Sequence, residues 1–226
     1  MATIRIHPEG PAIEPSLIAR YGALSTSLVS DSMDRSGALQ GIGMIGRGAG
    51  QTVSTVGPAL TVRVPEGDNL ALHVALDLLE PGMVLAVDAG GFEHRAVTGE
   101  LMIAYAEERG AVAIVVDGAV RDVEQLRAGR AAVFAKAVTH LGPYKSAPGE
   151  IRGPIALGGV SVRSGDLIMG DADGLVVVPH ERLAEIADAG EATARMEEEL
   201  LRGIRQGNYD RPWLTEVAEL RYVSQR

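Results

Sequence analysis

The chain has 226 residues, a formal net charge of −9 at pH 7 and no cysteine. This length favours one large domain or two small ones, and the acidic balance argues against a nucleic-acid partner, because non-specific binding to phosphates needs a basic surface. Without cysteine, disulfides, thiolate metal sites and cysteine nucleophiles are excluded. No stretch has the apolar length of a signal peptide or a membrane span, so we expect a cytoplasmic protein with no membrane partner.

The first two thirds of the sequence predict alternating helices and strands. A helix over residues 15–35 is followed by a glycine-rich connection over 37–50. Next come a strand at 53–64, a helix at 68–79, a strand at 84–87, a helix at 98–109, a strand at 113–116, a helix at 123–128 and a strand at 133–137. Asp68 and Thr98 are candidate N-caps. The alternation predicts a parallel component, in which ligands bind at the carboxyl ends of strands, so the loops 88–91 and 117–122 are candidate site loops.

The last third of the sequence changes character. Short β runs at 155–157, 160–162, 167–170 and 175–178 follow one another without intervening helices. An amphipathic helix is predicted over 181–206, Gly207 ends it, and a tail over 208–226 carries the single tryptophan, Trp213. The sequence therefore predicts a mixed α/β protein with two groups of strands and one long C-terminal helix.

Several motifs have a structural interpretation that outweighs a functional one. Residues 41–46 match G-x-G-x-x-G, but more glycines follow where a nucleotide-binding helix would begin, which favours a structural loop. The sequence Asp-Ala-Asp-Gly at 171–174 lies between two β runs and is typical of a hairpin turn rather than a cation loop. Among the histidines, His73 is predicted to pack within a helix, whereas His94 remains a candidate pocket residue.

The most informative pattern is Glu100 followed, after twenty residues, by Arg121 and Asp122. Arginine offers a planar, bidentate fork for a carboxylate or an enolate. An aspartate oxygen is a hard ligand suited to Mg²⁺ or Mn²⁺. Spacing alone leaves a second interpretation open, in which Glu100 caps a helix and the other two residues form an exposed ion pair.

Backbone amides extend this candidate site. Gly99 and Glu100 lie in the first turn of the helix predicted at 98–109. Amides in a first turn have no partner within the helix, so those of Leu101 and Met102 can bind a substrate carboxylate.

The pattern resembles the D/E-x20-R-D signature of the RraA-like family, which includes the class II 4-hydroxy-4-methyl-2-oxoglutarate / 4-carboxy-4-hydroxy-2-oxoadipate aldolases. The resemblance covers roughly residues 25–179. It is carried by Gly-Asp-Asn-Leu-Ala-Leu-His at 67–73, Pro-Gly-Met-Val-Leu-Ala-Val-Asp at 81–88, Asp-Gly-Ala-Val-Arg-Asp at 117–122 and the β segments at 158–160, 164–166 and 171–179. The tail after Gly207 lies outside it.

The resemblance implies a three-layer β/β/α fold of the swivelling, phosphohistidine-domain-like type with a C-terminal helix. It implies one RraA-like domain over 1–226, with a core at about 25–179 and a helix and tail at 180–226. It also implies a homotrimer or a hexamer with sites near subunit interfaces. Aldolase-competent members draw a further glutamate from a neighbour's C-terminal helix, for which Glu197, Glu198 and Glu199 compete here, and we favour Glu197.

The function implied is a divalent-metal-dependent lyase that releases pyruvate from 2-oxo acids, with oxaloacetate decarboxylation as a side activity. Asp122 is then the Mg²⁺ or Mn²⁺ ligand, Arg121 binds substrate and offsets enolate charge, and Glu100 holds water for proton transfer. The alternative is a regulator that binds and inhibits ribonuclease E without aldolase activity. A phosphoryl carrier would need an exposed histidine in a suitable loop, and His140 is a poor candidate.

Overall fold

The computed structural model describes residues 1–46, 55–208, 210–219 and 221. Four parallel strands form the centre of its large sheet: β3 (Thr55–Arg63), β4 (Val84–Thr98), β5 (Ala113–Val120) and β6 (Ala132–Val138). These strands are rich in β-branched and small aliphatic residues, as expected where both faces of a sheet are covered. At one edge β2 (Gly43–Gly46) pairs antiparallel with β6.

The other edge of the sheet is built from short strands distant in sequence. β7 (Gly149–Ile151) pairs antiparallel with β3 and parallel with β1 (Ile4–Ile6). A hairpin of β10 (Leu167–Gly170) and β11 (Leu175–Val178) also joins β3. A separate hairpin, β8 (Ile155–Leu157) with β9 (Val160–Val162), forms a second, two-stranded sheet.

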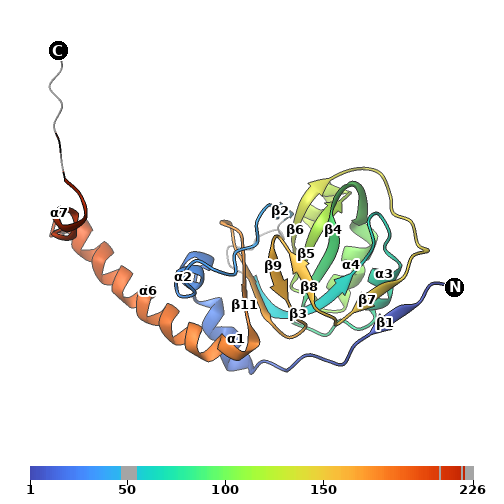
Figure 1. Cartoon of the computed structure of the whole chain (residues 1–226), viewed down its shortest axis with the longest axis horizontal. Coiled ribbons are helices and arrows are strands. Elements are labelled where there is room, and N and C mark those ends of the chain that lie inside the picture. Colours follow the sequence, from blue (N-terminus) through green and yellow to red (C-terminus); the bar gives the residue numbers. More distant parts are fainter. Residues whose placement is uncertain (47–54, 209, 220, 222–226) are drawn as a thin grey trace, which may run out of the picture.

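Helices cover the central sheet on one face, and the β8–β9 hairpin covers the other (Figure 1). The covering helices are α3 (Leu70–Leu76), α4 (Glu100–Glu108) and α5 (Val123–Ala128), which enclose an aliphatic core with the sheet. A further core lies between the β10–β11 hairpin and α1 (Pro15–Gly22), α2 (Thr26–Asp31) and the first part of α6 (Leu183–Arg205). A 3-10 turn (His180–Arg182) precedes α6, and α7 (Trp213–Val217) follows it.

The mixed α/β fold with a large sheet and a C-terminal helix is confirmed, but several boundaries differ from prediction. The helix predicted over 15–35 is two helices, because Ser25 begins a new one: its Oγ accepts a hydrogen bond from the Leu28 amide. β4 extends to Thr98, so residues 88–91 lie inside a strand, where Gly90 and Gly91 at φ of 68° and 69° allow an irregular register.

Other differences concern short elements and caps. The predicted loop at 41–46 contains β2, and residues 47–50 of the glycine-rich connection lie outside the described part of the chain. Neither β1 nor β7 was predicted, because each has too few residues to give a periodic signal. The N-caps of α3 and α4 are Asn69 and Gly99, one residue after the predicted Asp68 and Thr98. The turn at 171–174 is confirmed, with the Asp171 amide donating to the Gly174 carbonyl over 3.0 Å.

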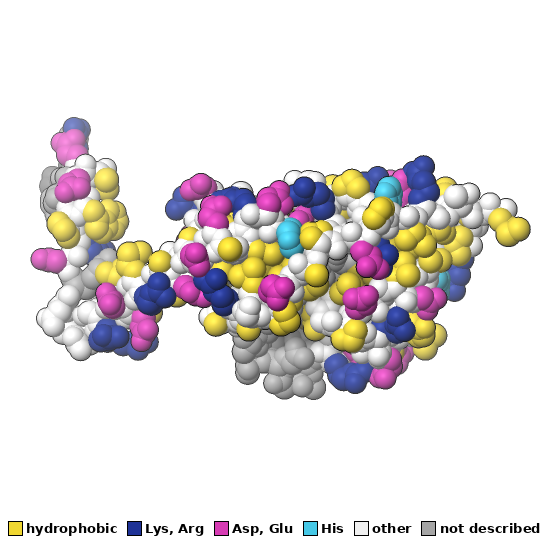
Figure 2. Space-filling model, turned by 90° about the horizontal axis from the view of Figure 1, so that it is seen from below, with side chains coloured by type: hydrophobic (Ala, Val, Ile, Leu, Met, Phe, Trp, Pro, Cys, Tyr) yellow, Lys and Arg dark blue, Asp and Glu magenta, His cyan; other side chains and the backbone are white. Residues whose placement is uncertain are grey.

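Beyond Ala194, α6 extends away from the sheet (Figure 1). Exposed apolar side chains line this distal part: Met196, Leu200, Leu201 and Ile204. Figure 2 shows hydrophobic side chains on the surface of the extension. Within the described residues, α6 and the other helices lack the combined length and apolarity that crossing a membrane requires.

Candidate functional site

The candidate site lies where β4 passes into α4 and β5 passes into α5. Because β4 and β5 are neighbouring parallel strands, their carboxyl ends meet, and the Arg121 amide donates to the Thr98 carbonyl over 3.1 Å. The Glu100 amide donates to Asp122 Oδ2 over 3.1 Å. Arg121 Nε lies 3.4 Å from the same carboxylate oxygen. The structure thus brings the side chains of Arg121 and Asp122 to the backbone of Glu100.

Gly99 is where the two junctions come closest. A Cβ built on Gly99 would overlap Asp122 Oδ2 and would lie 2.8 Å from Arg121 Cγ. The backbone there is extended, with φ of −166°, so close approach rather than backbone conformation requires a glycine. The absence of a side chain allows the carboxylate and the guanidinium to pack directly on the first turn of α4.

Asp122 has an unusual backbone conformation. It lies in the left-handed region, with φ of 64° and ψ of 41°, and its carbonyl accepts hydrogen bonds from the Gln125 and Leu126 amides at the start of α5. This conformation turns the carboxylate back toward α4. Among the described residues, Oδ1 has no hydrogen-bond partner, and the side chain is 37% exposed.

The first turn of α4 presents the predicted backbone donors. The Leu101 and Met102 amides have no hydrogen-bond acceptor among the described residues, whereas the Ile103 amide is bonded to the Gly99 carbonyl. Glu100 is exposed, and its side chain also lines a cavity of about 240 Å³ between α4 and α5. The helix terminus is therefore free to accept an anion beside the guanidinium of Arg121.

A loop that the sequence analysis missed forms one wall of the site. A Cβ on Gly142 would lie 2.8 Å from Arg121 Nη1, so the guanidinium packs against this backbone. The Gly142 carbonyl accepts a hydrogen bond from Arg95, whose guanidinium lies 4.3 Å from the centroid of the Tyr144 ring. These contacts join segments distant in sequence, and no local spacing could have revealed them.

Asn69 lies behind the same helix turn. The residue is 1% exposed, and its Nδ2 donates to the Val97 carbonyl over 2.8 Å and contacts Met102 Sδ at 3.2 Å. Its buried Oδ1 has no hydrogen-bond partner in the part of the chain that the structure describes. Asn69 therefore connects α3 to both sides of the β4–α4 junction, although the sequence analysis gave it no role.

The metal-ligating groups near Asp122 fit a cation that keeps most of its coordinated water molecules. The described residues contain no group of three or more His, Cys, Asp or Glu side chains arranged for a metal. One carboxylate with a free oxygen fits Mg²⁺, which commonly uses one or two protein carboxylates and completes its coordination with water and substrate. It does not fit Zn²⁺, which takes three or four protein ligands that include histidine nitrogen or cysteine sulfur.

Other residues considered from sequence lie elsewhere. Glu197, Glu198 and Glu199 are exposed on the part of α6 that extends away from the sheet. His94 is an exposed residue of β4 whose ring meets Phe92 edge-on at 5.4 Å. His73 lies within α3 as predicted; burial, and then the charge of Lys145, lower its pKa.

Comparisons with known proteins identify the family of this chain. The family model for RraA-like proteins, described as Aldolase/RraA, matches residues 26–177. A protein of Halalkalibacterium halodurans named "Putative 4-hydroxy-4-methyl-2-oxoglutarate aldolase" is 37% identical over 166 residues, which cover 74% of this chain and 78% of the relative. The 4-hydroxy-4-methyl-2-oxoglutarate aldolase of Thermus thermophilus is 35% identical over 136 residues, covering 60% of this chain and 82% of that protein.

A solved structure gives the same fold. Streptomyces coelicolor RraAS2, described as an unusual member of the RNase ES inhibitor RraA protein family, has a TM-score of 0.75 and 28% identity, covering 83% of this chain and 97% of that chain. Sequence and structure therefore agree, and this chain belongs to the RraA-like family.

Proposed function

We propose that this chain is a divalent-metal-dependent lyase that cleaves 4-hydroxy-4-methyl-2-oxoglutarate-type 2-oxo acids to pyruvate by a retro-aldol reaction. Oxaloacetate decarboxylation is the expected side activity, because it passes through the same pyruvate enolate. The observation that carries the proposal is the contact of Asp122 and Arg121 with the α4 turn at Gly99. The aldolase names of the relatives support it.

Substrate binding follows from the donors at this junction. The free amides of Leu101 and Met102 would bind the C1 carboxylate, since helix N-termini favour anions. Arg121, held against Gly142 and Asp122, would direct its remaining N–H groups to the 2-oxo oxygen. Asp122 would hold Mg²⁺ or Mn²⁺, which when bound supplies a Lewis acid for the 2-oxo carboxylate.

Bond cleavage then requires a proton acceptor and charge stabilisation. The C4 hydroxyl loses its proton, a carbonyl forms at C4, and the electron pair of the C3–C4 bond passes to the enolate of pyruvate. Glu100, an exposed residue whose amide contacts Asp122, is the proposed acceptor through a water molecule. Arg121 offsets negative charge on the enolate oxygen, and C3 is then protonated to release pyruvate. No lysine is required.

The proposed assembly is a homotrimer or a hexamer in which α6 reaches a neighbour. The exposed apolar residues on the distal part of α6 support a protein partner for this helix, and Glu197 is our candidate for a residue contributed to the neighbouring site. Size-exclusion chromatography with light scattering measures the mass, and a monomer at micromolar concentration would contradict this part of the proposal.

The test of the reaction is a Mg²⁺ titration of pyruvate release from oxaloacetate, coupled to lactate dehydrogenase, for wild type, Asp122→Asn and Glu100→Gln. Loss of activity in EDTA and recovery with Mg²⁺ or Mn²⁺ are expected of the wild type. High Mg²⁺ should partly rescue Asp122→Asn, which loses an anionic ligand, but should not rescue Glu100→Gln, which loses about 10–100-fold in kcat. If high Mg²⁺ rescued Glu100→Gln but not Asp122→Asn, Glu100 would be the metal ligand and Asp122 the residue that acts in proton transfer.

A regulatory function is the second candidate, because the similar S. coelicolor structure is described as belonging to a family of RNase ES inhibitors. If wild type and both variants release pyruvate at the same background rate, the lyase proposal fails. Inhibition of a ribonuclease E-type enzyme by the wild-type chain would then support the regulator.

A further inference from the structure

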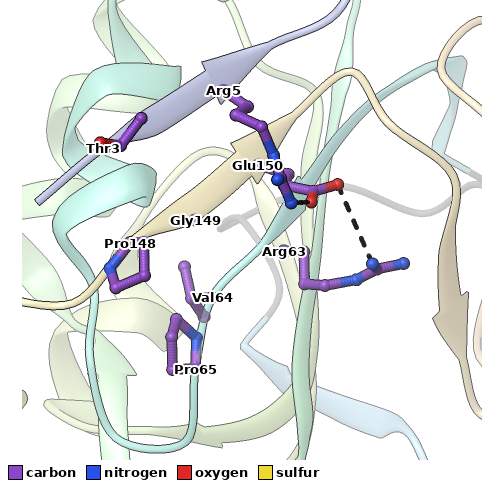
Figure 3. Close-up of a pocket in the computed structure, with 8 residues that line it drawn as sticks. All are labelled: Thr3, Arg5, Arg63, Val64, Pro65, Pro148, Gly149 and Glu150. Atoms are coloured by element: carbon purple, nitrogen blue, oxygen red, sulfur yellow. Dashed lines mark hydrogen bonds and ion pairs between the residues drawn. The ribbon is translucent and has the colours of Figure 1, made fainter.

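A row of opposite charges crosses one edge of the large sheet, away from the β4–α4 junction. The strand register places Arg5 on β1 beside Glu150 on β7, and Glu150 beside Arg63 on β3. Arg5 hydrogen-bonds Glu150 Oε1, and Arg63 Nη1 lies 3.9 Å from Glu150 Oε2 (Figure 3). One carboxylate is thus shared by two guanidinium groups.

A cavity of about 330 Å³ lies beside this row. Its lining combines the two arginines and Glu150 with apolar side chains, chiefly Val64, Pro65 and Pro148 (Figure 3). A largely apolar cavity with a few polar groups is typical of small-molecule sites. At roughly 30 Å³ for each non-hydrogen atom, the share of a water molecule in the liquid, the cavity would hold about ten such atoms.

Free guanidinium N–H groups at the cavity favour an anion, although Asp88, which lies outside the lining, offsets the charge of Arg63. Two guanidinium groups face one carboxylate among the lining residues. Arg5 is 69% exposed and its contact with Glu150 is its single partner among the described residues, so most of its N–H groups are free. Arg63 is 47% exposed and has more partners, since Asp88 Oδ2 lies 3.5 Å from Nε and the Pro154 carbonyl accepts from Nη2.

A histidine also contacts the carboxylate that the two arginines share. His7 Nε2 lies 3.5 Å from Glu150 Oε2, so a protonated His7 would compete with the arginines for that carboxylate. Arg5 first, and then Arg63 and His7, lower the pKa of Glu150 against the opposing effect of burial. Glu150 therefore stays ionised and holds Arg5 at the cavity.

We propose that this cavity is a second ligand site, for a small monocarboxylate with an apolar chain. Its carboxylate binds the free N–H groups of Arg5 and Arg63, for which the guanidinium fork is suited. Its chain lies against Val64, Pro65 and Pro148. The site is independent of the lyase proposal, because it shares no residue with Glu100, Arg121 and Asp122.

The test is isothermal titration calorimetry of the full chain with sodium hexanoate, sodium acetate and hexan-1-ol. Hexanoate should bind with a Kd below about 1 mM, and acetate and hexan-1-ol should each bind at least about tenfold more weakly, because each lacks one of the two recognised features. Arg5→Met and Arg63→Met keep much of the aliphatic stem but lose the fork, and each should weaken hexanoate binding by about tenfold or more.

Two further variants locate the binding. Arg130→Met is the matched control, because Arg130 is 66% exposed and paired with Glu108 on another part of the surface; it should leave the hexanoate affinity unchanged. Arg121→Met should also leave it unchanged, and loss of binding there would assign hexanoate to the candidate lyase site. The proposal is overturned by that result, by no detectable hexanoate binding, by equal affinity for acetate or hexan-1-ol, or by unchanged affinity in both Arg5→Met and Arg63→Met.

Discussion

Replacing Gly99 with alanine adds one methyl group at the closest point of the site. The new Cβ would lie 2.8 Å from Arg121 Cγ, whereas carbon atoms in contact prefer about 3.5–4.0 Å. Arg121 must therefore move by roughly 0.7–1.2 Å, and Asp122 Oδ2, which the methyl group would overlap, must move as well. A displacement of about 1 Å in a reacting group can cost 10²-fold, so kcat/KM should fall by about 100-fold, or about 2.7 kcal/mol of transition-state stabilisation.

The assay is pyruvate release from oxaloacetate at saturating Mg²⁺, with thermal unfolding measured on the same samples. Gly43→Ala is the control, because a Cβ on that strand residue meets no atom within 4 Å and should leave the rate unchanged. Activity of Gly99→Ala within threefold of wild type would refute the reasoning. So would an equal loss of activity in Gly43→Ala.

Three other substitutions test two further contacts of the site and one contact in the β10–β11 turn. Arg121→Lys should lose nearly as much kcat as Arg121→Ala, about 10²–10³-fold, because lysine keeps the charge but not the fork; a lysine variant within about twofold of wild type would contradict this. Asn69→Leu should lower kcat about 10–100-fold through displacement of the α4 turn while Mg²⁺ affinity stays unchanged, and an altered Mg²⁺ midpoint would count against this positioning role. Asp171→Asn should reduce stability near neutral pH and the variant should approach wild type in acid, as followed by chemical denaturation against pH, with Asp173→Asn as control. Burial raises the pKa of Asp171, but hydrogen bonds from Thr26 and the Asp173 amide outweigh this effect, so the net pKa is lowered. The ionised carboxylate therefore stabilises the fold at pH values above its unfolded pKa of 3.8. This contribution is lost as the pH falls through the pKa of the folded state. A constant difference at all pH values would refute that linkage.

The proximity of the candidate site residues follows from simple rules of strand order, whereas their function was left open by spacing alone and was inferred from the family resemblance. Arg121 and Asp122 lie at the end of a strand, and Glu100 lies in the first turn of a helix that follows the adjacent parallel strand. Strand adjacency alone then brings the two junctions together. The C-terminal helix and the β10–β11 hairpin were predictable for the same reason, since periodicity and turn residues are local signals.

The missed features depend on contacts between distant segments. Gly142 lies against Arg121 because the loop after β6 folds back over β4, where the Leu141 carbonyl accepts from the Ala96 amide over 2.8 Å. β1 and β7 are three-residue strands that are stabilised by pairing with each other, although they lie far apart in the sequence. The full length of β4 was missed because Gly90 and Gly91 look like a turn in sequence, although the strand continues beyond them.

The position of the Asp122 carboxylate favours the functional interpretation of the site over an exposed ion pair. A non-glycine residue in the left-handed region costs roughly 1–2 kcal/mol, whereas an exposed ion pair contributes about 0–1 kcal/mol, so the contact with Arg121 alone would not offset the conformation. The hydrogen bond from the Glu100 amide to the carboxylate, and those from the first amides of α5 to the Asp122 carbonyl, supply the remaining stabilisation. The result is a half-exposed carboxylate whose Oδ1 stays free of partners among the described residues, beside a guanidinium and two free amides. Asp34, Arg35 and Arg152 also lie in the left-handed region, so the free carboxylate oxygen beside a guanidinium and two amides, rather than the backbone conformation, is what favours a ligand site.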